Sequence, residues 1–68
     1  IEKNDEVNLD EKMLKNLALE KIEIPEGYQV KRQRVKKIYD EKPYYRVITY
    51  LENNYGFSVS KIFEYRLE

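Results

Sequence analysis

Residues 43–68, PYYRVITYLENNYGFSVSKIFEYRLE, hold most of the aromatic side chains of the chain and decide its fold. Two apolar runs in this segment flank Asn53-Asn54-Tyr55-Gly56. This cluster of residues tolerates turn conformations, including positive φ, and favours a tight reversal between paired strands. The segment therefore predicts a β-hairpin, and the rest of the chain is interpreted around it.

Composition favours strands in both arms of the hairpin, although periodicity alone also allows a helix. A helical template over Tyr44–Leu51 is apolar at all four of its positions. However, six of these eight residues are β-branched or Tyr, types that fit a pleated surface and lose χ1 freedom in a helix. The second arm, Phe57–Leu67, alternates apolar and polar residues with the period of a strand, apart from Lys61.

A helical interpretation of the same segment defines the alternative fold. With Gly56 as a C-cap and Ser58 as an N-cap, residues 45–67 resemble the helix-turn-helix family. The resemblance covers about a third of the chain. It implies an all-α module in place of a hairpin.

The N-terminal part of the chain predicts one helix over Leu9–Ile22. Asn8 is placed as its N-cap, Glu11 completes a capping box, and residues 1–7 are expected to form a flexible lead-in. The apolar positions form a stripe that is expected to pack on the sheet, namely Leu9, Met13, Leu14, Leu17, Ala18 and Ile22.

A first strand is expected over Tyr28–Tyr39, after a short linker that contains Pro25 and Gly27. Its alternation changes phase between Val30 and Val35, so one extra residue, a β-bulge, is predicted near Arg32 or Gln33. Residues 40–43 form a tight turn to the next strand. The sequence thus predicts a single α+β domain, residues 8–68, with a helix packed on a three-stranded antiparallel β-meander.

Alternation also predicts which side chains of the hairpin face the helix. Lys61 falls on this face, and we expect it to reach the sheet edge or to pair with Glu20 or Glu23. The expected core consists of the odd-numbered apolar positions and Thr49: Tyr45, Val47, Thr49, Leu51, Phe57, Val59, Phe63, Tyr65 and Leu67.

The opposite side of the sheet is the candidate binding surface. Ile48 and Ile62 are expected to form an exposed apolar patch there, and such patches mark contact surfaces. Tyr and Arg, which surround the patch, are enriched where proteins bind partners. The candidate binding residues are Lys31, Arg32, Arg34, Lys36, Lys37, Tyr44, Arg46, Ile48, Tyr50 and Ile62.

Two functions compete for this surface. In the first, it is a protein interface, either with a second copy of the chain or with a regulatory partner, and the isoleucines form its centre. In the second, it binds DNA: the basic residues of the first strand and Arg46 neutralise phosphates, while Tyr44 and Tyr50 stack on bases or pack against sugars.

Charge and size bear on both functions. The net charge is zero, but residues 28–39 carry five bases and no acid, so the first strand is a local basic block. A chain of 68 residues without cysteine lies near the lower limit for a stable core. Dimerisation would supply further burial, so a homodimer is expected.

The residue types that are missing argue against catalysis and metal binding. There is no His and no Cys, which removes the common zinc sites and the usual partners of nucleophilic catalysis. No glycine-rich phosphate loop is present, because Gly27 and Gly56 stand alone. We therefore expect no enzymatic activity and no cofactor. No apolar run is long enough to span a membrane.

Overall fold

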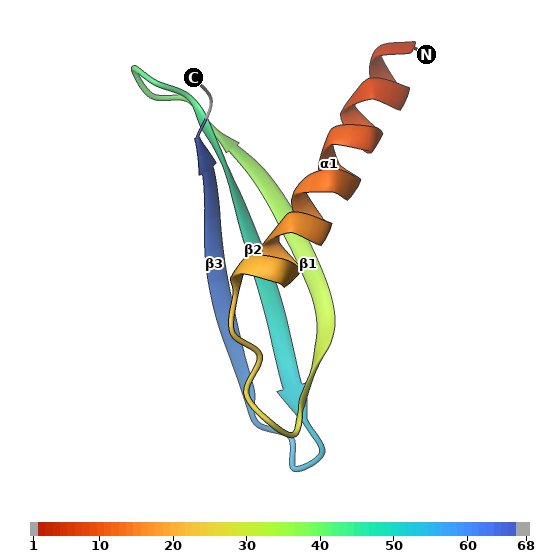
Figure 1. Cartoon of the computed structure of the whole chain (residues 1–68), viewed down its shortest axis with the longest axis vertical. Helices are drawn as coiled ribbons and strands as arrows, with labels where there is room; N and C mark the ends of the chain where they lie inside the picture. The colour runs from red at the N-terminus through yellow and green to blue at the C-terminus, as the bar shows by residue number, and fades with distance from the viewer. Residues whose placement is uncertain (1, 67–68) are drawn as a thin grey trace.

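The chain folds as one helix on a three-stranded antiparallel sheet (Figure 1). The computed structural model describes the backbone of residues 2–66 and the side chains of residues 11–66. The elements follow in the order α1 (Glu2–Lys21), β1 (Tyr28–Ile38), β2 (Tyr44–Asn53) and β3 (Ser58–Arg66), and β2 is the central strand. The predicted α+β meander is confirmed, and the all-α helix-turn-helix alternative is wrong.

Helix α1 begins before the N-cap that the sequence predicted. Its backbone is helical from Glu2, so Asn8 lies inside the helix rather than at its start. The side chains of the expected lead-in, residues 1–7, and of Asn8 are outside the described ones. At the other end, the linker reverses through Gly27, whose φ of 88° favours glycine, and the Tyr28 amide donates to the Pro25 carbonyl.

The turn between β2 and β3 is fastened by one side chain. The Oδ1 atom of Asn53 accepts hydrogen bonds from the amides of Tyr55, at 3.0 Å, and Phe57, at 2.9 Å. Gly56 has a φ of 89°, the left-handed conformation that a tight reversal needs. Because the Asn53 amide also donates to the Phe57 carbonyl, this turn sets the register of the whole hairpin.

The predicted β-bulge is present, one residue earlier than expected. The pairing of β1 with β2 shifts between Val30 and Arg32, so Lys31 is the extra residue. The bulge brings Val30 and Val35 to the same side of the sheet, opposite Leu51 and Val47.

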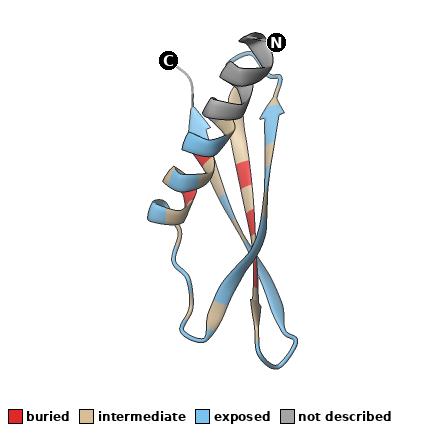
Figure 2. Ribbon diagram, turned by 90° about the vertical axis from the view of Figure 1, so that its right-hand side faces the viewer, coloured by how far each residue is buried: buried red, intermediate tan, exposed pale blue. Residues whose placement is uncertain are grey.

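The core is small and lies where α1 crosses the sheet (Figure 2). Val35, Tyr45 and Phe63 pack around it. Among the described side chains, the buried ones are Leu14, Ala18, Val47, Leu51 and the polar Thr49.

Several residues that were expected in the core are exposed. Phe57, Val59 and Tyr65 lie on the predicted side of the sheet but are 66%, 38% and 41% exposed. Met13 of the helix is 68% exposed. For Phe57 and Val59 the reason is coverage, because α1 crosses only one end of the sheet and the end near the β2–β3 turn has no helix above it (Figure 2). Met13 and Tyr65 instead line an open groove between α1 and the sheet. Leu9 and Leu67 lie outside the described side chains.

Lys61 supports the predicted phase of β3. It is half-buried and lies opposite the buried Thr49, so it belongs to the helix-facing side. It forms no ion pair with Glu20 or Glu23, and that part of the expectation is wrong.

Gln33 joins the helix to the sheet. Its Nε2 donates to the carbonyl of Lys15 in α1 and to the Oγ1 of Thr49 in β2, each at 3.1 Å. We expect Gln33→Ala to lower the free energy of unfolding by about 1–2 kcal/mol, because the buried hydroxyl of Thr49 loses this donor. Urea denaturation measures the difference. Gln29→Ala, on an exposed residue of the same strand, is the control, and equal losses for both variants would contradict this role.

Candidate interaction surface

The side of the sheet that faces away from α1 is one continuous surface, which we call the outer face. Residues paired across antiparallel strands point to the same side, so the strand register assigns its members. The bulge residue Lys31 joins it, because its ammonium lies 3.1 Å from Glu52. The outer face comprises Gln29, Lys31, Arg32, Arg34, Lys36, Ile38, Tyr44, Arg46, Ile48, Tyr50, Glu52, Ser58, Ser60, Ile62, Glu64 and Arg66.

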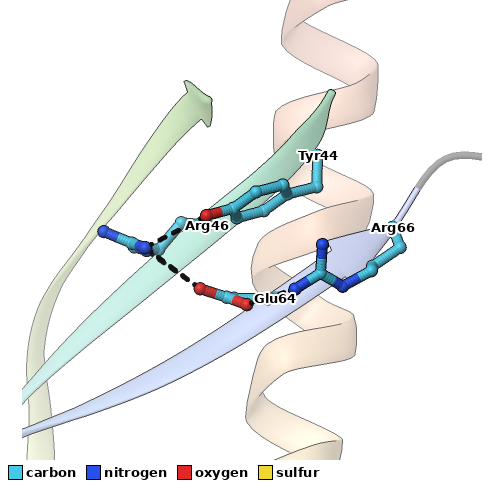
Figure 3. A network of polar contacts seen from close by, with 4 residues as sticks. All are labelled: Tyr44, Arg46, Glu64 and Arg66. Carbon is cyan, nitrogen blue, oxygen red and sulfur yellow. Dashed lines mark hydrogen bonds and ion pairs between the residues drawn. The ribbon is translucent and has the colours of Figure 1, made fainter. Parts of the chain in front are cut away.

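A four-residue polar cluster occupies the end of the outer face near the β1–β2 turn (Figure 3). Glu64 of β3 lies directly opposite Arg46 of β2 and accepts from its Nε at 3.2 Å and its Nη2 at 3.1 Å. The other carboxylate oxygen of Glu64 accepts from Arg66 at 3.2 Å. One acid thus holds two guanidinium groups.

Tyr44 completes this cluster. Its hydroxyl accepts from Arg46 at 3.3 Å, and the Arg66 guanidinium lies over its ring at 4.5 Å from the centroid. The hydrogen bond to Glu64, and then the charge interaction with Tyr44, raise the pKa of Arg46 above its ordinary value. The Arg46–Glu64 pair is partly exposed, so solvent screens it and its contribution to stability is small.

A second stacked pair lies further along the outer face. The guanidinium of Arg32 lies 4.3 Å from the ring centroid of Tyr50, its cross-strand neighbour. This distance is within the range of a cation–π interaction. The pair brings a positive charge and an aromatic ring together at a half-exposed position.

The centre of the outer face is a short row across the three strands, formed by Arg34, Ile48 and Ile62. Ile62 is 59% exposed, whereas Ile48 is only partly accessible, so the predicted apolar patch is smaller than expected. Arg34 and its neighbour Lys36 are exposed and form no ion pair with any side chain of residues 11–66.

The outer face carries an excess of positive charge. It holds six basic side chains and two acidic ones, although the whole chain has a net charge of zero. Three of the bases are engaged by Glu52 and Glu64, which leaves Arg32, Arg34 and Lys36 without an acidic partner among the described side chains. An acidic ligand would be attracted to these three positions.

Of the candidate binding residues, Lys37 is misplaced. It lies opposite Tyr45 on the helix-facing side, with its ammonium 5.6 Å from that ring and 5.5 Å from the ring of Tyr39. Its charge made Lys37 a candidate, but strand alternation after the bulge places it on the same side of the sheet as Val35. The structure places the other nine predicted residues on the outer face.

Three residues that form ion pairs on the outer face, Glu52, Glu64 and Arg66, were not among the candidate binding residues. Of these, Glu64 organises the polar cluster. The signal was present in the sequence, because Arg46 and Glu64 are equidistant from the turn between Asn53 and Phe57. In a hairpin of that register the two residues must face each other. Ile38, at the edge beside Tyr44, was missed too.

The described side chains contain no group of three or more acidic residues that could hold a metal ion. Within residues 2–66, no helix is both long enough and apolar enough to cross a membrane. Comparison with protein-family models, with curated proteins and with solved structures gives no match to this chain.

Proposed function

We propose that this chain is a non-enzymatic interaction module that binds an acidic segment of another protein on its outer face. The observation that carries the proposal is the combination of basic side chains and an exposed isoleucine at the centre of the outer face. Arg32, Arg34 and Lys36 lack acidic partners among the described side chains, and the exposed side chain of Ile62 lies beside them. A ligand that offers carboxylates around an apolar side chain would satisfy both features.

Three details favour a protein over a nucleic acid. Half of the bases of the outer face are already paired with Glu52 or Glu64. One side of each tyrosine ring is covered by an arginine of the same chain, which competes with the stacking of a base. An isoleucine at the centre of the surface suits an apolar side chain better than a phosphate.

DNA binding is the second candidate, and the excess of basic side chains on one open sheet face favours it. A two-stranded ribbon of this kind can enter the major groove. In that case Arg34 and Lys36 of β1 would contact phosphates, and binding would weaken steeply with salt. The two candidates therefore differ in the ligand and in its salt dependence.

The test selects ligands from a displayed library of random peptides and measures the affinity of the selected peptides by fluorescence anisotropy. We expect enrichment of peptides that combine Asp or Glu with a large apolar residue. Arg34→Glu should weaken their binding at least about tenfold, because it reverses a charge at the centre of the surface. Lys12→Glu, the same charge change on an exposed residue of α1, should leave the affinity unchanged.

Two results would overturn the proposal. The first is enrichment of peptides without acidic residues, or equal effects of Arg34→Glu and Lys12→Glu. The second is binding of duplex DNA that falls about a hundredfold or more between 50 and 200 mM salt and is lost in Arg34→Glu, which would establish the nucleic-acid candidate.

A further inference from the structure

The two edges of the sheet differ in chemistry. The β1 edge carries Lys31, Arg32, Arg34, Lys36 and Lys37, so a second β1 would be repelled. The β3 edge has no neighbouring strand in the structure (Figure 1) and carries charges of both signs among apolar residues. Such an edge is open to pairing with another strand.

We propose that two copies of this chain associate by antiparallel pairing of β3 with β3, around a two-fold axis at Ile62. In this register Ile62 meets its own copy on the outer face, and Val59 meets Tyr65 on the helix-facing side. These three are the exposed large apolar side chains of β3. Each therefore gains an apolar neighbour, while Ser60 lies opposite Glu64. Lys61 lies opposite Phe63, where its methylene groups can pack against the ring and its ammonium can extend to solvent.

Neighbouring registers are less favourable. A two-fold axis at Lys61 places two ammonium groups opposite each other, which is destabilising. An axis at Phe63 places the apolar Ile62 opposite the charged Glu64. Of these three registers, the axis at Ile62 is the one that gives each exposed apolar side chain of β3 an apolar neighbour, in an isologous contact.

A groove on the helix-facing side extends the proposed contact. It has a volume of about 500 Å³ and lies between α1 and the sheet, lined mainly by Met13, Leu17, Tyr45 and Tyr65. Because Val59 of the second copy would lie opposite Tyr65, it would reach the mouth of this groove. Partial burial of these side chains would enlarge the small core of each copy. A short chain without disulfides needs such additional burial to be stable.

The proposed dimer is closed. It forms one six-stranded sheet with both helices on the same side, and its two remaining edges are the basic β1 strands, which resist further pairing. The outer faces of the two copies become continuous. The inference does not rest on the proposed function, because the pairing depends on the backbone of the β3 edge and on the Ile62–Ile62 and Val59–Tyr65 contacts. Of these residues, only Ile62 also belongs to the outer face.

Disulfide cross-linking tests the register directly, because the chain has no cysteine. In the proposed register two Ile62→Cys residues face each other at about 4.5–5.5 Å between Cα atoms, within the reach of a disulfide. Two Ser60→Cys residues would be about 14 Å apart between Cα atoms, beyond that reach. We expect rapid oxidation to a covalent dimer for Ile62→Cys only. Equal rates for these two exposed positions would overturn the register.

Sedimentation equilibrium tests the association itself. Val59→Lys should raise the dimer dissociation constant at least about tenfold, because it places a charge against the ring of Tyr65. The double variant Val59→Lys, Tyr65→Glu should restore the dimer by a new ion pair across the axis. A wild-type chain that stays monomeric at millimolar concentration would overturn the proposal. That result would not affect the peptide binding predicted for the outer face.

Discussion

Leu51→Ala is expected to remove most of the stability of the protein at 25 °C. Leu51 has no exposed surface and is the largest fully buried side chain among the described ones. Its truncation costs about 2–5 kcal/mol, from lost burial and the cavity that remains. A domain of this size without disulfides is stabilised by only about 3–5 kcal/mol, so one such substitution removes most of the total.

Circular dichroism during thermal and urea denaturation measures this effect. Val30→Ala is the matched control, because Val30 lies directly opposite Leu51 on the same side of the sheet but is 40% exposed. We expect the control to lose less than about 1 kcal/mol. A Leu51→Ala variant with the melting temperature of the control would mean that the core is not centred on β2.

The sequence predicted the strand phase because alternation and the turn are local properties. The positions of Val47, Thr49 and Leu51 follow from a period of two, and the turn at Asn53 sets their partners in β3. The bulge was predicted from the same alternation, but its position was not. A change of phase between Val30 and Val35 says that one residue is extra without saying which one.

Coverage by the helix could not be predicted from alternation. Val47 and Val59 have the same parity and lie on the same side of the sheet, yet Val47 is buried and Val59 is exposed. The difference depends on the angle at which α1 crosses the sheet, and the pattern of hydrophobic positions in the sequence does not specify this angle. The same reason explains Met13, a member of the predicted apolar stripe that lies beside the contact rather than in it.

For the outer face, the sequence predicted most of the binding residues but not which of their side chains pair with one another. Arg46 and Tyr44 were candidates for their own chemistry, whereas the acid that organises them, Glu64, is on another strand. A search by residue type selects bases and aromatic residues. Only the register shows which of those bases already have a partner.

Ala18→Glu is expected to separate α1 from the sheet. Ala18 is fully buried in the same cluster as Leu14 and Val47, where the absence of a longer side chain lets the helix backbone approach β2. A glutamate at this position must either bury its carboxylate without a partner or lift the helix. Either outcome costs about 3 kcal/mol or more, which is comparable with the total stability.

Met13→Glu is the control, because it introduces the same charge in the same helix at a position that is 68% exposed. It should change the free energy of unfolding by less than about 0.5 kcal/mol. Urea denaturation followed by circular dichroism compares the two variants. Equal free energies of unfolding for the two variants would show that contacts of Ala18 do not hold α1 on the sheet. The sheet would then have to be stable without the packing of α1 against it. That is not expected of three strands whose buried apolar residues, Val47 and Leu51, both face the helix side.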